Sequence, residues 1–188
     1  MNVILDEYRQ FLLEVDALCA ELAVRHAQHL NCRRGCSGCC TDISVLPVEW
    51  SSIREGLSEP AGMIRAAARP ASAAPDHLCA FLVDRSCSIY PLRPLICRAH
   101  GLPLVYRVES YDAAGNSLET DEWQTCWCGL NFTGLSPTTF VSQHGAEAVL
   151  NMENLNRKLL QLNRRYVGSP EGRRFRAEER LELSALLG

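Results

Sequence analysis

The sequence predicts an α+β fold: a single, mainly helical domain with small β-hairpins and a cysteine-rich metal-binding centre. Apolar residues recur at helical spacing near both ends, and shorter extended runs separated by turn residues occupy the middle. Nine of the ten cysteines lie between Cys32 and Cys128. A length of 188 residues is typical of one domain, and no linker or repeat divides it. We expect one domain over residues 1–188, with terminal helices flanking a cysteine-cluster region at residues 30–130.

Residues 2–30 predict a long amphipathic helix, because Tyr8, Phe11, Val15 and Leu22 recur at three- and four-residue multiples. Cys19 lies on the same apolar stripe, so we predict a core residue there rather than a metal ligand. Residues 43–46 favour a short strand. Pro47 follows at a position typical of the first turn of a helix.

The middle of the chain predicts two hairpins. Residues 58–76 are rich in Ala, Pro and Ser, and a short helix is expected over Met63–Arg69. Residues 79–90 predict the first hairpin, with its turn at residues 84–86. Residues 95–101 predict one or two helical turns that end at a glycine, and residues 104–123 predict the second hairpin.

The C-terminal third predicts helix. One long helix is expected from Ser136 to Tyr166, since Met152, Leu155, Leu159 and other apolar residues form a stripe along it. The sequence Ser-Pro-Glu at residues 169–171 is a helix-start signal, which favours a short final helix ending in residues 181–187.

Composition excludes several classes of function. A net charge of −3 gives no general attraction to nucleic acid or to an anionic membrane. Residues 41–49, which follow four closely spaced cysteines ending at Cys40, also lack the basic face that a DNA-reading helix needs. The N-terminus has neither a basic segment nor an apolar span, so no export signal or membrane segment is expected. We therefore expect a cytoplasmic protein whose clustered cysteines bind metal rather than form disulfides.

The densest cluster holds four cysteines within nine residues: Cys32, Cys36, Cys39 and Cys40. Spacings of three or four residues let one turn aim two sulfurs at one ion. The side chains of the adjacent residues Cys39 and Cys40 are expected to point to opposite faces and to bind different metal ions. The alternatives for this pair are a bridged polynuclear site, or one metal ligand beside one buried thiol.

The remaining candidate ligands are Cys79, Cys87, Cys97, Cys126 and Cys128. Eight thiolates can fill two four-coordinate sites, or one iron–sulfur cluster and a second site. Nine candidates leave one over, which we expect to be one of the last two. His100 follows Cys97 at a spacing that lets both face one ion.

Four arginines lie beside the candidates and can offset thiolate charge by hydrogen bonds to sulfur. They are Arg33, Arg34, Arg93 and Arg98.

Residues 30–130 resemble the YkgJ-like, or CxxCxxCC, family of zinc- or iron-chelating cysteine-cluster proteins. The resemblance rests on the tetrad and on Cys79-Ala-Phe-Leu, Cys87-Ser-Ile-Tyr and Arg93-Pro-Leu-Ile-Cys-Arg. It implies zinc or iron, including a [4Fe-4S] cluster, held by about eight cysteines: the tetrad, Cys79, Cys87, Cys97 and either Cys126 or Cys128. This chain departs from the family pattern, because three residues separate its first two cysteines.

Three functions remain open on the sequence. The first is a metal-binding module, which closed cysteine shells favour. The second is an iron–sulfur oxidoreductase or group-transfer enzyme, as in a relative of this family, the flagellin lysine methylase. The third is a zinc enzyme with water activated near His100, Glu49 or Asp42. No protease, phosphate-loop or nucleotide motif supports enzymatic activity, which stays open.

Overall fold

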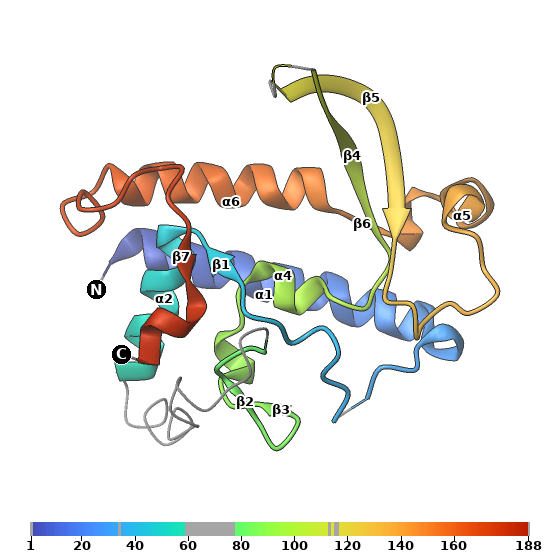
Figure 1. The fold of residues 1–188 in the computed structure, drawn as a ribbon, viewed down its shortest axis with the longest axis horizontal. Helices are drawn as coiled ribbons and strands as arrows, with labels where there is room; N and C mark the ends of the chain where they lie inside the picture. The colour runs from blue at the N-terminus through green and yellow to red at the C-terminus, as the bar shows by residue number, and fades with distance from the viewer. Residues whose placement is uncertain (1, 34, 59–77, 113, 115–116, 188) are drawn as a thin grey trace. The chain divides into compact units, whose positions relative to one another are not determined.

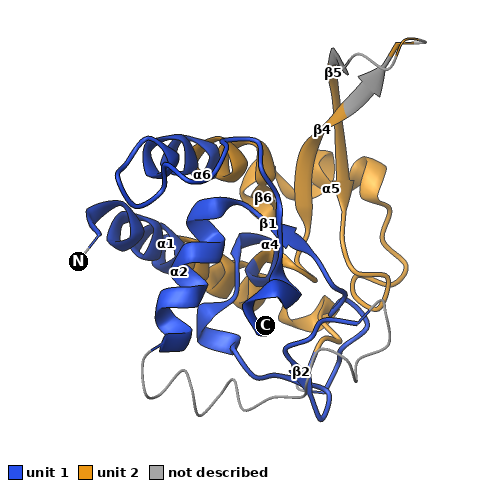
Figure 2. Cartoon of the chain, turned by 60° about the vertical axis from the view of Figure 1, so that its left-hand side comes forward, with its two compact units in different colours: residues 1–14, 33–98, 159–188 blue, residues 15–32, 99–158 orange. Residues whose placement is uncertain are grey.

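The computed structural model describes residues 2–33, 35–58, 78–112, 114 and 117–187 (Figure 1). Contacts divide the chain into two compact units (Figure 2). The first unit comprises Met1–Glu14, Arg33–Arg98 and Leu159–Gly188, and the second comprises Val15–Cys32 and Ala99–Lys158. The content of helices and short sheets is that of the predicted α+β class. A single domain over the whole chain stays a prediction.

The first helix, α1, runs from Val3 to Arg25 and contributes residues to both units. Its start is capped by Asn2, whose side-chain oxygen accepts hydrogen bonds from the N–H groups of Ile4 (3.0 Å) and Leu5 (3.3 Å). The predicted apolar stripe is buried along the helix. A 3-10 turn, η1 (Ala27–His29), follows, so the predicted N-terminal helix is confirmed with an earlier end.

The first unit contains α2 (Pro47–Ser58), which begins at the predicted proline. Strand β1 (Ser44–Val45) pairs antiparallel with β7 (Leu181–Glu182), and the 3-10 helix η5 (Leu183–Leu187) follows β7. A buried core cluster joins these elements to the first hairpin: Val45, Ile53, Phe81, Ile89 and Leu183.

The first predicted hairpin is confirmed in the same unit. Strands β2 (Leu82–Val83) and β3 (Ser86–Cys87) pair antiparallel. Asp84 and Arg85 both have positive φ, at 47° and 58°, as a two-residue hairpin turn with matching twist requires. The 3-10 helix η3 (Tyr90–Leu92) and the short helix α4 (Leu95–Ala99) follow.

The second unit contains a three-stranded sheet in the order β5-β4-β6. The second predicted hairpin is confirmed and is longer than expected, with β4 at Leu104–Tyr111 and β5 at Ser117–Cys126. Strand β6 (Leu150–Asn151) pairs in parallel with the start of β4. A buried cluster of Phe132, Phe140, Ala148 and Val149 forms a core in this unit.

The long helix expected from Ser136 to Tyr166 is confirmed at both ends but is interrupted at residues 145–151. Helix α5 (Pro137–His144) ends at Gly145, whose φ of 85° is outside the helical region and suits glycine. The 3-10 helix η4 (Ala146–Ala148) and β6 follow before α6 begins at Met152 and runs to Val167. Pairing of Leu150 with Leu104 in the sheet therefore outweighs the helical periodicity.

The expected C-terminal helix is wrong over most of its length. The Ser169 hydroxyl does accept a hydrogen bond from the Gly172 N–H (3.2 Å), but turns rather than a helix follow up to residue 178, and only the 3-10 helix η5 at Leu183–Leu187 is helical. Residues 181–182 pair with β1 instead, and the Arg180 guanidinium donates to the Ser44 carbonyl (2.9 Å). The helix expected at 63–69 lies outside the described residues.

No helix in the described ranges combines the length and the apolar character that a membrane crossing requires.

Candidate metal centre

All ten cysteines lie within the described residues, and all are thiols rather than disulfides. The first unit holds six of them: Cys36, Cys39, Cys40, Cys79, Cys87 and Cys97. The second unit holds Cys19, Cys32, Cys126 and Cys128. Cys19 is partly buried on α1. Metal ligation needs cysteines that are reduced and can lose their proton, and a disulfide framework is excluded in this structure.

In the first unit, backbone pairing brings distant cysteines together. The Cys79 N–H donates to the Cys40 carbonyl (3.1 Å), beside an antiparallel bridge between Thr41 and Leu78. The Cys79 carbonyl accepts from the Leu82 N–H (3.0 Å), and Leu82 is paired with Cys87 across the hairpin. Three segments bearing candidate ligands are thus joined by main-chain hydrogen bonds.

The sulfurs of Cys79 and Cys87 each receive a local backbone hydrogen bond. The Phe81 N–H points at the Cys79 sulfur and the Ile89 N–H at the Cys87 sulfur, and each bond lowers the pKa of its thiol. Burial acts in the opposite direction and is larger, so both pKa values are raised. A donor aimed at sulfur favours the thiolate, which is the form that binds metal.

Cys97, on α4, has its pKa raised to about 12, mainly by burial and then by repulsion from the thiolates of Cys79 and Cys87. Cys40 adds to this repulsion, whereas the charge of Arg93 opposes it. Mutual repulsion requires the sulfurs to be near one another, since electrostatic interactions fade with distance. A cation among these thiols would offset both the burial cost and the repulsion.

The pair Cys39 and Cys40 differs from the expected arrangement. The Thr41 N–H donates to the Cys39 carbonyl (3.0 Å), so the chain turns here instead of running extended. Burial raises the pKa of Cys40 to about 11. Repulsion from the charges of Cys39, Cys79 and Cys87, and a hydrogen bond that the Cys40 thiol donates to the Cys39 sulfur, raise it further. The prediction of sulfurs on opposite faces is therefore wrong, because side-chain alternation holds only for extended chain.

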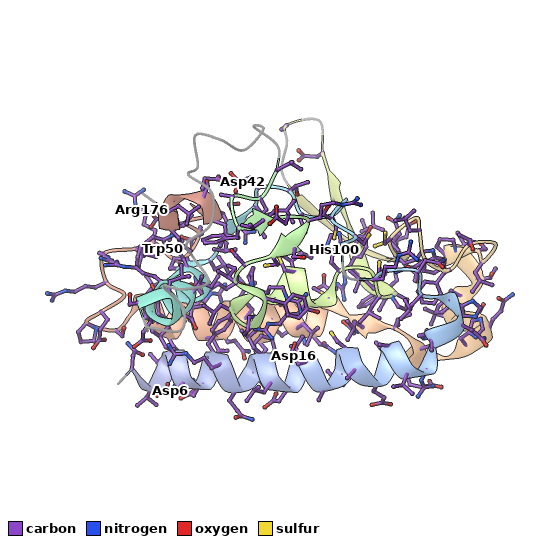
Figure 3. All side chains as sticks on the ribbon, turned by 90° about the horizontal axis from the view of Figure 1, so that it is seen from below. Asp6, Asp16, Asp42, Trp50, His100 and Arg176 are labelled. Atoms are coloured by element: carbon purple, nitrogen blue, oxygen red, sulfur yellow. The ribbon has the colours of Figure 1, made fainter. Side chains whose placement is uncertain are left out.

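Asp42 supplies a further test of whether a cation fits. The Oδ2 atom of this side chain (labelled in Figure 3) accepts a hydrogen bond from the Ser184 hydroxyl (3.0 Å). Its Oδ1 atom is buried with no hydrogen-bond partner in the part of the chain that the structure describes. Its charge also raises the pKa of Cys79, after burial and Cys87. A buried carboxylate oxygen without a partner, on a residue whose charge acts on the Cys79 thiol, fits a zinc or iron ion by donor chemistry.

The described residues do not form a closed ligand shell. No group of three or more His, Cys, Asp or Glu side chains within them is arranged to hold a metal ion. The structure therefore gathers the thiols of the first unit without completing a coordination geometry.

Arg93 acts on the thiols through its charge. Its guanidinium donates to the carbonyls of Tyr90 (3.1 Å) and Cys97 (3.1 Å) and lies 3.6 Å from the centre of the Tyr90 ring. Arg98 likewise donates to the carbonyls of Arg93 (2.8 Å) and Pro91 (2.7 Å). These bonds fix the segment between Cys87 and Cys97, a role that the sequence analysis did not assign. Arg34 lies outside the described residues.

Two residues considered for water activation have other surroundings. Glu49 is only 4% exposed, and its carboxylate accepts hydrogen bonds from the N–H groups of Leu46 (3.1 Å) and Leu95 (3.2 Å) and from the Tyr8 hydroxyl (3.4 Å). It therefore anchors the first turn of α4. His100 (Figure 3) is exposed and lies in the turn directly after α4, which ends at Ala99, and its role as a ligand stays a prediction.

In the second unit, one candidate ligand lies at the end of the sheet. Cys126 is the last residue of β5 and is paired with Leu104. It also contacts the hydroxyl of Tyr106, whose pKa is raised by burial and then by Cys126. The Cys128 carbonyl accepts from the Asn131 N–H (2.8 Å). Asn131 was not a sequence candidate, because nothing local distinguishes it from a loop asparagine.

A family model described as "CxxCxxCC: Putative zinc- or iron-chelating domain" matches residues 31–129 of the chain. The match spans just over half of the sequence and contains all nine cysteines that the sequence analysis selected as candidate ligands. A search of curated proteins and a search of solved structures found no match. The chain therefore belongs to the CxxCxxCC family, whose description as a zinc- or iron-chelating domain supports metal binding.

Proposed function

We propose that the chain chelates zinc or iron through about eight cysteine thiolates, with a centre built on Cys40, Cys79, Cys87 and Cys97 of the first unit. The observation that carries this proposal is the main-chain pairing that joins the segments of Cys40, Cys79 and Cys87. The raised pKa of Cys97 supports it, because Cys79, Cys87 and Cys40 all contribute repulsion there. Cys36 and Cys39 supply further thiolates from the tetrad loop.

Burial and mutual repulsion disfavour the thiolate form of these cysteines unless a cation is present. They therefore favour the binding of a metal ion that replaces the thiol protons. The alternative role for these cysteines is simple core packing, since Cys79 and Cys87 both contact the apolar cluster of the first unit. The N–H groups that point at their sulfurs favour the ligand role, because an apolar thiol needs no such donor.

Cys32, Cys126 and Cys128 of the second unit are proposed as further ligands on the strength of the sequence pattern. The ligand role requires reduced cysteines, so the proposal also includes a reducing compartment such as the cytosol.

An iron–sulfur cluster, with electron or group transfer as its role, is the second candidate. The contact between Cys39 and Cys40 favours it over two separate zinc ions, because neighbouring sulfurs on one side of a turn suit a polynuclear site. The bound group would supply the redox chemistry, and the chain's thiolates and the charge of Arg93 would set its potential.

Anaerobic purification followed by elemental analysis tests the proposal. We expect stoichiometric zinc or iron in the wild-type protein. Colourless protein containing zinc selects the chelating module, whereas brown protein containing iron and acid-labile sulfide selects the cluster. Protein that carries neither metal, and takes up neither after reduction of its thiols, contradicts the proposal.

A further inference from the structure

The Cys32 sulfur has a buried polar neighbour, Asn131, within the second unit. The side-chain nitrogen of Asn131 donates a hydrogen bond to this sulfur, at 3.2 Å. Asn131 is only 1% exposed, although Cys32 itself is exposed. A buried amide is therefore aimed at the first cysteine of the tetrad from a position 99 residues further along the chain.

The remaining hydrogen bonds of Asn131 fix the orientation of its amide. Its oxygen accepts from the N–H groups of Asn31 (2.8 Å) and Cys32 (3.1 Å), which only the oxygen end can do. Its nitrogen donates to the Gly101 carbonyl (2.7 Å) as well as to sulfur. Two N–H hydrogens thus meet two acceptors, and a flipped amide would lose all of these bonds.

Gly101 provides the space for this arrangement. Its φ of 97° is one that glycine adopts without strain. A Cβ atom at this position would lie 3.3 Å from the Cys32 sulfur and 3.4 Å from the Asn131 nitrogen. Both the backbone conformation and the close approach of sulfur favour glycine here.

We propose that Asn131 is a positioning residue for a metal ion bound through Cys32: it holds the Cys32 backbone in place and stabilises the thiolate by the N–H to sulfur bond. The inference rests on the proposed function, since it treats Cys32 as a ligand. It adds a residue beyond the end of the family match at residue 129. Partners that hydrogen-bond to a ligand commonly change metal affinity by about 10- to 100-fold.

The variant Asn131→Asp separates the two ends of the amide. One carboxylate oxygen can still accept from the N–H groups of residues 31 and 32, while the donor to sulfur is replaced by a repelling oxygen. We expect the affinity for Zn²⁺, measured by competition with a chromophoric chelator, to fall by about 10- to 100-fold.

A double-mutant cycle distinguishes positioning from general damage. In a Cys32→Ser background, Asn131→Asp should change the Zn²⁺ affinity less than about twofold, because the acceptor sulfur is gone. An equal loss in both backgrounds, or no loss in either, would overturn the inference. Asn163→Asp is the matched control, since Asn163 is equally buried and bridges the Val48 N–H (3.1 Å) and the Ala177 carbonyl (2.9 Å). Its effect should be the same in both backgrounds.

A measurement on the unmutated protein covers the case in which Asn131→Asp does not fold. With ¹¹³Cd²⁺ bound, scalar coupling to the Cys32 β-protons would identify this cysteine as a ligand. Coupling to an Asn131 side-chain amide proton would then show the hydrogen bond to metal-bound sulfur. Cys32 coupling without Asn131 coupling overturns the inference alone, whereas wild-type protein that binds no Cd²⁺, Zn²⁺ or iron overturns the proposed function and the inference together.

Discussion

At the scale of single residues, Cys97 and Cys19 are buried to a similar class of exposure but lie on different elements. Cys97 is partly buried, and its raised pKa reflects both burial and the thiolates around it. Cys19 is also partly buried, but it belongs to the stripe of α1. The two therefore form a matched pair for testing which cysteines bind metal.

Cys97→Ser should lower both the bound metal and the melting temperature, because a serine hydroxyl is a poor ligand for soft metals and metal binding contributes folding free energy. The loss in stability should be several kcal/mol, given that structural zinc contributes about 10 kcal/mol or more. Elemental analysis and thermal unfolding measure the two effects. Cys19→Ser should retain its metal; a Cys19 variant as depleted as the Cys97 variant would contradict the separation.

His26 gives a pH dependence that belongs to the second unit. It is 5% exposed, donates from Nε2 to the Ala148 carbonyl (2.9 Å) and packs edge-on against Phe132. Its pKa is lowered mainly by burial, with the charges of His29, Arg25 and His144 acting in the same direction and the bond to Ala148 opposing them.

Because the pKa of His26 is lowered in the folded state, its imidazole stays neutral there at pH values between this lowered pKa and about 6.5. The unfolded chain binds more protons over the same pH range. Stability should therefore fall as the pH drops below about 6.5 toward the folded pKa. Urea unfolding of metal-free protein at a series of pH values measures this. His26→Gln should flatten the profile, and exposed His100→Gln should leave it unchanged; the reverse pattern would refute the assignment.

At the scale of elements, Glu49 links the start of α2 to the start of α4. Its buried carboxylate accepts from backbone groups near both helices, and burial is the main reason that its pKa is raised. Because α4 carries Cys97, this carboxylate also helps to hold a proposed ligand in place.

Glu49→Ala should lower the free energy of unfolding by about 3 kcal/mol, because two buried N–H groups lose their acceptor. Denaturant titration measures the change. Glu55→Ala is the control, since Glu55 forms an exposed ion pair with Arg9 and such pairs contribute about 0–1 kcal/mol. Equal effects of the two substitutions would contradict this role for Glu49.

The elements near the cysteines also show why local patterns succeed or fail. The first hairpin was predictable because its turn signal and its two strands are adjacent in the sequence. The helix expected from Ser136 is interrupted because Gly145 adopts a positive φ and Leu150 pairs with Leu104. Leu104 belongs to β4 and lies more than forty residues before Leu150 in the sequence. A helical stripe carries no information about such a partner.

At the scale of the whole molecule, the proposed metal joins segments of the first unit that are otherwise held by short ladders. Strands β1, β2, β3 and β7 are two residues long each. Sheets of that size contribute little alone, so a bound ion should contribute much of the local stability.

Removal of metal by a chelator should therefore lower the melting temperature and increase hydrogen exchange at residues 36–40 and 79–97. Scanning calorimetry and exchange mass spectrometry measure the two effects, and added Zn²⁺ or iron should reverse them. The Cys97→Ser protein serves as the control and should respond little to chelator. Unchanged exchange in these segments after complete metal removal would contradict a structural role for the ion.

The sequence by itself determined which side chains are available and which local elements carry them. The residue types and spacings from Cys32 to Cys128 indicated soft-metal chemistry, and the family match covers the same region. Turn and helix signals placed Cys87 on a hairpin and Cys97 on a helical turn, because these depend on neighbouring residues.

The tertiary structure decided which groups surround the sulfurs. Only the folded chain places the Asn131 amide on Cys32, the Glu49 carboxylate at α4 and the Cys39 thiol against Cys40. The first two contacts join residues 99 and 46 positions apart. Burial makes such polar contacts necessary, since an unpaired buried group costs free energy, but many distant partners could satisfy it and local sequence does not specify which one does.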